Sequence, residues 1–99
     1  MMKYAISKQD GSAVIRIKGW LDSQTAPELD KFVRSSLTDV TDLVFDLSEL
    51  KYISSAGLRV LLYASKVMLR QGSMKVTGCS DEILEIFEIT EFSEILTIE

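Results

Sequence analysis

Short apolar runs alternate with stretches of helical periodicity along this chain, and this alternation constrains the fold more than any other feature. The run Leu43–Leu47, interrupted only by Asp46, is typical of a strand buried on both faces. A long helical pattern follows, from the Ser54-Ser55 pair to Gln71. Strands separated by helices of about a dozen residues indicate right-handed crossovers and a mainly parallel sheet. We therefore expect an α/β fold.

The N-terminal half predicts a hairpin and a first helix. The runs Tyr4–Lys8 and Ala13–Lys18 flank a turn, as the two strands of a hairpin do. The spacing of Thr25 and Glu28 predicts a capping box, in which the two side chains satisfy unpaired backbone donors at a helix start.

The C-terminal half predicts two more strands and one more helix. Gly72 stands where a left-handed helix cap is expected, and Met74–Thr77 is a short strand candidate. A third helix starts at Ser80, and Ile95–Ile98 is expected to close the domain as a last strand. The predicted order is β-β-α-β-α-β-α-β, a mainly parallel or mixed sheet of about five strands. Residues 1–99 form one domain in this prediction.

The composition excludes several classes of chemistry. Histidine is absent, so a Ser-His-Asp triad cannot form and the commonest metal ligand is missing. The single cysteine, Cys79, excludes a multi-thiolate metal site and fits a reducing compartment. No glycine-rich phosphate loop is present. We expect no metal and no cofactor.

The charge balance and the N-terminus bear on partners and location. Eleven basic and fifteen acidic residues give a net charge of −4, which argues against nucleic acid and anionic membrane surfaces as partners. No apolar segment approaches the ~18–20 residues needed to span a bilayer. Met1–Ile6 lacks a signal-peptide core. A cytoplasmic protein is expected.

The helix that follows Ser55 has apolar residues on two faces. Residues placed 100° apart predict one core stripe along the helix. Its members are Leu58, Leu61, Leu62, Ser65, Met68 and Leu69. Val60, Tyr63 and Val67 fall on the opposite face. A second apolar face is covered either by the same chain or by a partner. We therefore treat Val60, Tyr63 and Val67 as candidate partner contacts.

The start of this helix carries a pair of serines. Ser54 or Ser55 is placed as the N-cap, with its hydroxyl close to free backbone N–H groups. One interpretation is a structural cap alone. The other is a phosphorylation site, because a phosphate there would gain N–H donors and the positive end of the helix dipole. Spacing alone leaves both interpretations open.

A resemblance to a known family adds to this interpretation. The segment Tyr52–Leu61, with the letters YISSAGLRVL, resembles the signature of the STAS domain, particularly of bacterial anti-sigma factor antagonists. Gly19–Ala26 resembles the family's Gly-x-Leu-Asp segment, and Leu43–Ser48 resembles its central strand. Many antagonists have aspartate before the acceptor serine and serine or threonine after it, where this chain has Ser54 and Ala56.

The resemblance implies a partner-switching function without catalysis. Such antagonists bind an anti-sigma factor that is also a serine kinase, and phosphorylation of a serine at the start of the second helix ends the binding. A serine phosphatase resets the switch, and ATP belongs to the kinase. By resemblance Ser55 is the acceptor, with Ser54 as the fallback. The resemblance, with the helix pattern, gives an expected partner surface: Asp22, Ser23, Thr25, Asp46, Ser54, Ala56, Gly57, Leu58, Val60, Tyr63 and Val67.

Two other functions stay open at this point. The chain could be a constitutive scaffold or adaptor subunit of a signalling or transport complex. It could also bind a nucleotide or small anion directly at the start of the second helix. A monomer is expected, or a weak dimer formed through an edge strand near the N-terminus.

Overall fold

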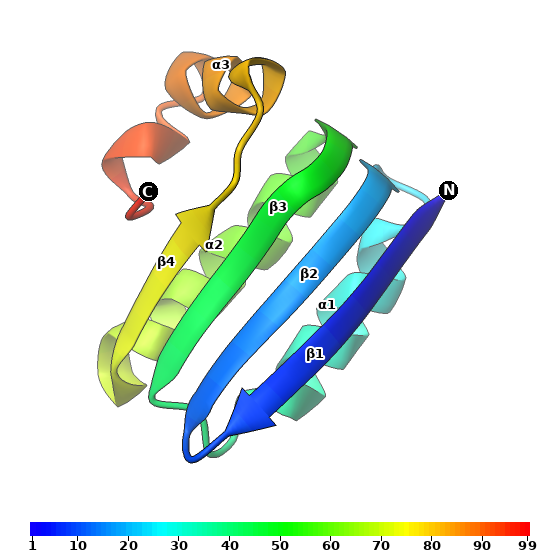
Figure 1. Ribbon diagram of the computed structural model, residues 1–99. Helices are drawn as coiled ribbons and strands as arrows, with labels where there is room; N and C mark the ends of the chain where they lie inside the picture. Colours follow the sequence, from blue (N-terminus) through cyan, green and yellow to red (C-terminus); the bar gives the residue numbers. More distant parts are fainter.

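The strands and helices follow the predicted order as far as the third helix, and the computed structural model describes all of residues 1–99. The elements are β1 (Met2–Gln9), β2 (Ser12–Leu21), α1 (Ala26–Ser36), β3 (Asp42–Ile53), α2 (Ser55–Gln71), β4 (Ser73–Thr77), α3 (Asp81–Ile89) and a 3-10 turn, η1 (Phe92–Glu94). The strands form one sheet in the order β1-β2-β3-β4 (Figure 1). β1 is antiparallel to β2, whereas β2, β3 and β4 are parallel to one another.

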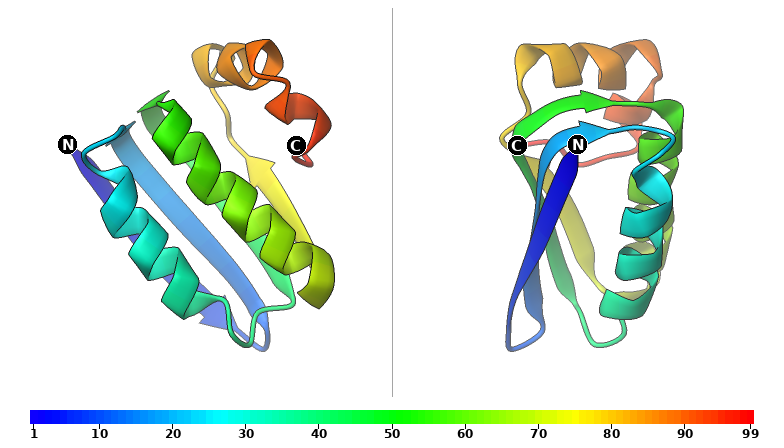
Figure 2. Two further views of the ribbon diagram at one scale, coloured as in Figure 1. Left: turned by 180° about the vertical axis from the view of Figure 1, so that it is seen from behind. Right: turned by 90° about the vertical axis from the view of Figure 1, so that its right-hand side faces the viewer.

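Helices α1 and α2 cover the same face of the sheet, and the other face carries no helix (Figure 2). The topology causes this arrangement. Because β2, β3 and β4 are neighbours in chain order, each right-handed crossover moves the chain in the same direction and places its helix on the same side. α3 lies across the end of the sheet and packs against β3. None of these helices has both the length and the apolar character that crossing a membrane requires.

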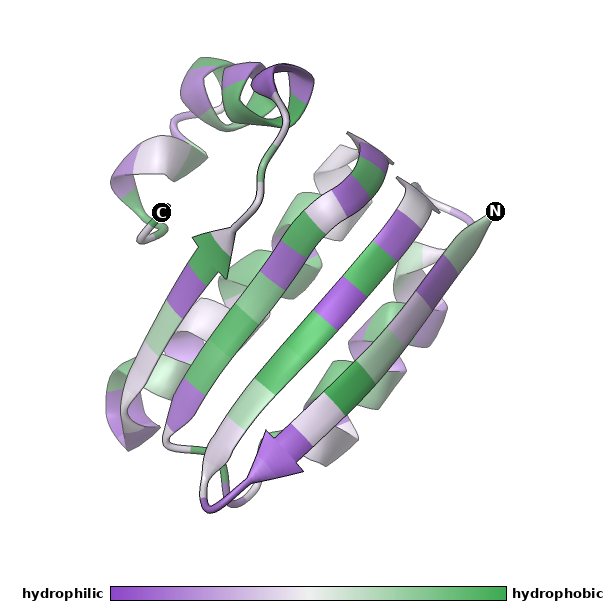
Figure 3. Ribbon diagram, in the orientation of Figure 1, coloured by the Kyte–Doolittle hydropathy of each residue, from purple (hydrophilic) through white to green (hydrophobic).

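The core therefore lies on one side of the sheet only. Leu43, Phe45 and Leu47 point toward the helices and are fully buried. Val44 and Asp46 alternate with them and are half-buried on the helix-free face. Along the strands, hydrophobic residues alternate with hydrophilic ones (Figure 3). The prediction that residues 43–47 are buried on both faces is wrong, because α1 and α2 both cover the same face of the sheet and leave the other face without a helix.

The structure has four strands, so the prediction of about five is corrected. The predicted strand Ile95–Ile98 is replaced by η1 and a single parallel bridge between Val76 and Ile98. The turn lets Leu96, which is buried, enter the core, since its N–H bonds back to the carbonyl of Phe92 at 2.9 Å. Only two backbone hydrogen bonds, both to Val76, then join the C-terminal residues to the edge of β4.

Gly72 ends α2, but not in the left-handed conformation that the sequence predicts. Its φ is 169°, which is ordinary extended backbone, and its N–H bonds to Met68 O at 2.8 Å. A Cβ at this position would lie 1.8 Å from the carbonyl oxygen of Thr41. Glycine is therefore required by the close approach of the segment before β3, and the expected reason is wrong.

Candidate functional site

The two serines at the start of α2 have different environments. Ser54 is the N-cap: its backbone is extended, and its hydroxyl oxygen accepts a hydrogen bond from Gly57 N at 3.4 Å. Its own N–H donates to Leu21 O at 2.9 Å, which ties the helix start to the end of β2. Ser55 is the first helical residue and is exposed. The cap function thus falls to Ser54, and Ser55 keeps a hydroxyl that faces solvent.

Gly57 holds the start of α2 close to the sheet. A Cβ at this position would lie 2.7 Å from Leu21 Cγ and 2.8 Å from Ile53 Cγ1. Gly57 and Leu58 are both buried, so the expectation that they contact a partner is wrong for this conformation. Their role is to seat the helix N-terminus against the carboxyl ends of β2 and β3. Ala56 remains half-buried beside them.

Asp22 organises the loop between β2 and α1. Its Oδ1 accepts from Gln24 N at 3.0 Å and from Thr25 N at 3.1 Å. In return, the Thr25 hydroxyl accepts from Asp22 N at 2.9 Å. The predicted capping box between Thr25 and Glu28 is not formed: the Thr25 side chain makes no cap hydrogen bond, and the Thr25 N–H that Glu28 was expected to satisfy donates to Asp22 instead. Ser23 is exposed at the tip of this loop.

The hydrogen bonds at this loop lower the pKa of Asp22. The Thr25 N–H is the main cause, and the Gln24 N–H and the Thr25 hydroxyl add to it. Since the native pKa lies below that of the unfolded chain, ionised Asp22 stabilises the fold at neutral pH. This contribution is complete above the unfolded pKa, near about 4, and is lost as the pH falls toward the native pKa.

Asp22→Asn should therefore flatten the acid side of the stability profile. The Asn side chain keeps an acceptor oxygen for the loop but does not titrate. We expect the urea midpoint of wild type to fall between about pH 5 and pH 3 more steeply than that of Asp22→Asn. Urea titrations at several pH values measure this difference. An equally steep fall in both proteins would contradict the assignment.

Asp46 does not belong to this group. It lies mid-strand on the helix-free face, where its Oδ2 is 3.2 Å from Arg16 Nε and its Oδ1 accepts from Ser48 N at 3.0 Å. The Ser48 N–H is the largest cause that lowers its pKa. At about 3.3 Å per residue, Asp46 is on the order of 20 Å from the end of β3. The expectation that Asp22 and Asp46 line one surface is wrong.

The second apolar face of α2 is mostly covered by the chain itself. Val60 is only 2% exposed. Tyr63 lies beneath the guanidinium of Arg34 from α1, 3.9 Å from the ring centre, and Val67 packs partly against the core. Burial therefore removes Val60 from a partner surface in this conformation, whereas contact of the half-buried Tyr63 and Val67 with a partner stays a prediction. Conversely, Leu69 was expected in the core but is 86% exposed.

Two aromatic residues at the same end of the sheet were not among the predicted site residues. Trp20 is 50% exposed and Tyr52 is 44% exposed, and they are direct partners in the register of β2 and β3. A signal was present in the sequence: each precedes an apolar residue, Leu21 or Ile53, that closes its strand toward the core. The register shifts between Gly19 and Trp20, but within each last pair the side chains still alternate, so Trp20 and Tyr52 turn outward.

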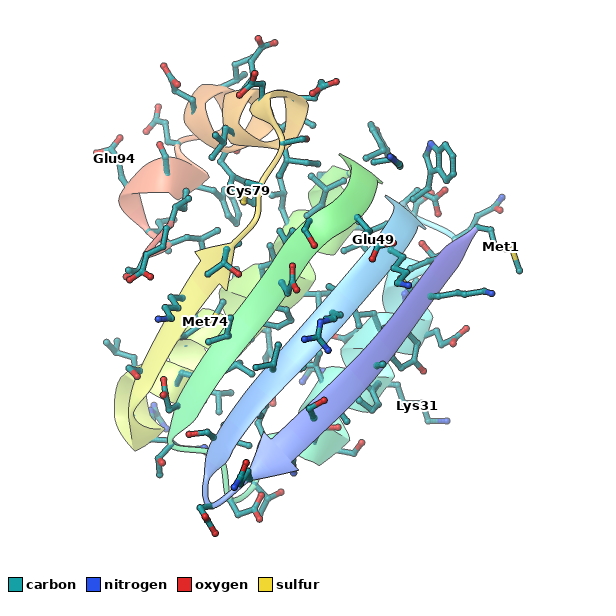
Figure 4. The ribbon with its side chains drawn as sticks, viewed as in Figure 1. Met1, Lys31, Glu49, Met74, Cys79 and Glu94 are labelled. Atoms are coloured by element: carbon teal, nitrogen blue, oxygen red, sulfur yellow. The ribbon has the colours of Figure 1, made fainter.

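The structure shows neither a cluster of metal ligands nor an activated thiol. No three acidic or cysteine side chains come together in a group that could hold a metal ion. Cys79 lies in the segment between β4 and α3 (Figure 4), and partial burial raises the pKa of its thiol. What the geometry presents is an exposed hydroxyl at a helix N-terminus, beside a rigid loop and two exposed aromatic rings.

Fold and site together define a small α/β domain with an exposed serine at the start of its second helix. The chain belongs to the STAS domain family, whose model matches residues 3–99. An anti-sigma-B factor antagonist of Listeria monocytogenes is 34% identical over 86 residues, which cover 85% of this chain and 75% of that protein. The similarity extends to solved structures.

An anti-sigma factor antagonist from Mycobacterium paratuberculosis superposes with a TM-score of 0.87 at 21% identity, over 99% of this chain and 85% of that one. The antagonist SpoIIAA in its unphosphorylated form gives a TM-score of 0.77 at 16% identity, over 98% of this chain and 87% of that one. The phosphorylated form of SpoIIAA, a Bacillus cell fate determinant, gives 0.76 at 15% identity, over 98% and 91%. At these identities the solved structures establish the fold.

Proposed function

We propose that this chain is an anti-sigma factor antagonist whose binding is switched by phosphorylation of Ser55. The observation that carries the proposal is the division of roles at the start of α2. Ser54 caps the helix, while the hydroxyl of Ser55 is exposed. Its relatives are named anti-sigma factor antagonists, and SpoIIAA, which shares the fold, exists in unphosphorylated and phosphorylated forms.

The local structure can accept a phosphate on Ser55 without unfolding. The first backbone N–H groups of α2 and the positive end of its dipole favour an anion at this position. The phosphate would take the net charge from −4 to about −6. The partner that follows from this proposal is an anti-sigma factor with serine kinase activity, which binds the ATP. A serine phosphatase would return the domain to its binding form.

We expect Ser55→Ala to abolish phosphorylation by the cognate kinase-type anti-sigma factor. Incubation with that purified kinase and ATP, followed by peptide mass spectrometry, measures the phosphate and its position. Ser54→Ala should still accept phosphate on Ser55, although loss of the cap costs about 1 kcal/mol. Ser80→Ala is a matched control, because Ser80 caps α3 in the same way, accepting from Ile83 N at 3.3 Å.

Three outcomes would contradict this assignment. Equal phosphorylation of Ser55→Ala and wild type would exclude Ser55 as the acceptor. Loss of phosphorylation in Ser54→Ala, but not in Ser80→Ala, would move the acceptor to Ser54. Stable binding with no phosphorylation of any variant would favour a constitutive adaptor.

A further inference from the structure

Trp20 and Tyr52 form a pair of exposed aromatic rings on the helix-free face of the sheet. The two residues are register partners at the ends of β2 and β3. Leu21 and Ile53, which follow them, are buried toward the helices, so Trp20 and Tyr52 point the other way. Met1, whose carbonyl accepts from Trp20 N, is also exposed, whereas other exposed large apolar side chains, such as Leu69 and Ile89, lie on other elements. The pair is thus a local concentration of exposed aromatic area.

The backbone beneath this pair is held firmly. Trp20 N–H donates to Met1 O at 2.9 Å, and the Thr25 hydroxyl lies 3.0 Å from Trp20 O, to which it can donate. The next residue, Leu21, accepts from Ser54 N at 2.9 Å. Because this backbone is already ordered, binding has to restrict only the two side-chain torsions of each ring. Rigid Trp and Tyr residues are the types enriched at the energetic centres of protein interfaces.

The same hydrogen bonds connect the aromatic pair to the phosphorylation site. Leu21, next to Trp20, bonds to Ser54, the residue before Ser55. Tyr52 is three residues before Ser55 on the strand that leads directly into α2. A protein surface that covers Ser55 can therefore extend over the aromatic pair without interruption.

The charges beside the aromatic pair leave an excess of one sign. Glu49, which projects from the helix-free face (Figure 4), lies 3.5 Å from the amine of Lys18, so these two charges offset each other beside the pair. Lys51, the residue before Tyr52, is exposed and makes no ion pair, so one basic charge remains there, and an acidic group at the rim of a partner's pocket would complement it. An apolar pocket is the surface that two half-exposed aromatic rings complement.

We propose that Trp20 and Tyr52 are the hydrophobic anchor of the interface, inserting into an apolar pocket of the anti-sigma factor. This inference rests on the proposed function. It adds that the interface extends from the start of α2 onto the helix-free face of the sheet. A phosphate on Ser55 then lies at the margin of an area that binding has desolvated, where an unpaired charge is costly.

Trp20→Ala should weaken binding of the purified anti-sigma factor by about 30-fold or more, and Tyr52→Ala by about 10-fold or more. Leu69→Ala is the control: it also removes an exposed apolar side chain, but near the other end of α2, and its Kd should stay within about twofold of wild type. Trp20 is the only tryptophan, so its emission should shift to the blue as complex forms. Thermal melts check folding, and Trp20→Thr keeps strand propensity should Trp20→Ala unfold.

The outcomes separate this inference from the proposed function. If Trp20→Ala, Trp20→Thr and Tyr52→Ala bind as wild type while Ser55→Asp does not bind, the anchor is refuted and the switch stands. If wild type does not bind the anti-sigma factor, the proposed function fails and the anchor with it. If sedimentation shows a dimer of this chain alone that Trp20→Ala dissociates, a second copy occupies the pair and the inference is overturned.

Discussion

Ser55→Asp is expected to weaken binding of the anti-sigma factor by at least about 30-fold while leaving the domain folded. A carboxylate at the first residue of α2 is favourable for the helix, because it lies at the positive end of the dipole. In the complex the same charge would be covered without a partner. When one partner of a charge pair in an interface is removed, the charge left unpaired costs about 2–5 kcal/mol of binding free energy, which is about 30-fold to several thousandfold in Kd.

Isothermal titration of the purified anti-sigma factor with each variant measures this loss. Ser12→Asp is the matched control, because it adds the same charge at the exposed start of β2, the opposite end of that strand from Trp20. Its Kd should stay close to that of wild type, and Ser55→Ala should also bind. A folded Ser55→Asp with a Kd within about threefold of wild type would refute the switch.

The parts of the fold that depend on neighbouring residues were predictable from the sequence. The N-cap expected at Ser54 or Ser55 is found at Ser54, and the helix start expected at Ser80 and the strand–helix alternation are confirmed, since hydrogen bonds within a few residues determine them. Thr25 is the exception. Its N–H donates to Asp22, three residues before it, rather than to Glu28, because two local hydrogen-bonding patterns compete for this donor.

Features that depend on which helices and strands are neighbours in the fold were not predictable from the periodicity of the sequence. Helical spacing correctly groups Tyr63 with Val67 but does not reveal that α1 covers this side of α2. The sequence of residues 43–47 predicts a strand buried on both faces, because Val44, which is only half-buried in the structure, is as apolar as a core residue. The aromatic pair becomes visible only when the register brings Trp20 beside Tyr52.

Phe45→Ala is expected to destabilise the domain by about 3–5 kcal/mol, the largest effect on folding that we predict. Phe45 lies in the middle of β3 and is 0% exposed. Ile15 and Val76, its register partners on either side, are also fully buried, so neither strand can move into the space without losing hydrogen bonds. A cavity would remain, and its volume adds to the lost transfer free energy.

The matched control lies on the same strand. Tyr52→Ala removes a ring of similar size, but one that is 44% exposed, and should cost less than about 1–2 kcal/mol. Urea unfolding at 25 °C measures both values, and similar m-values would show that the unfolded states are comparable. Because a small domain has only about 5–15 kcal/mol of stability, Phe45→Ala could leave a large unfolded fraction. Equal losses for the two variants would mean that the core is not on the side of the sheet where the helices lie.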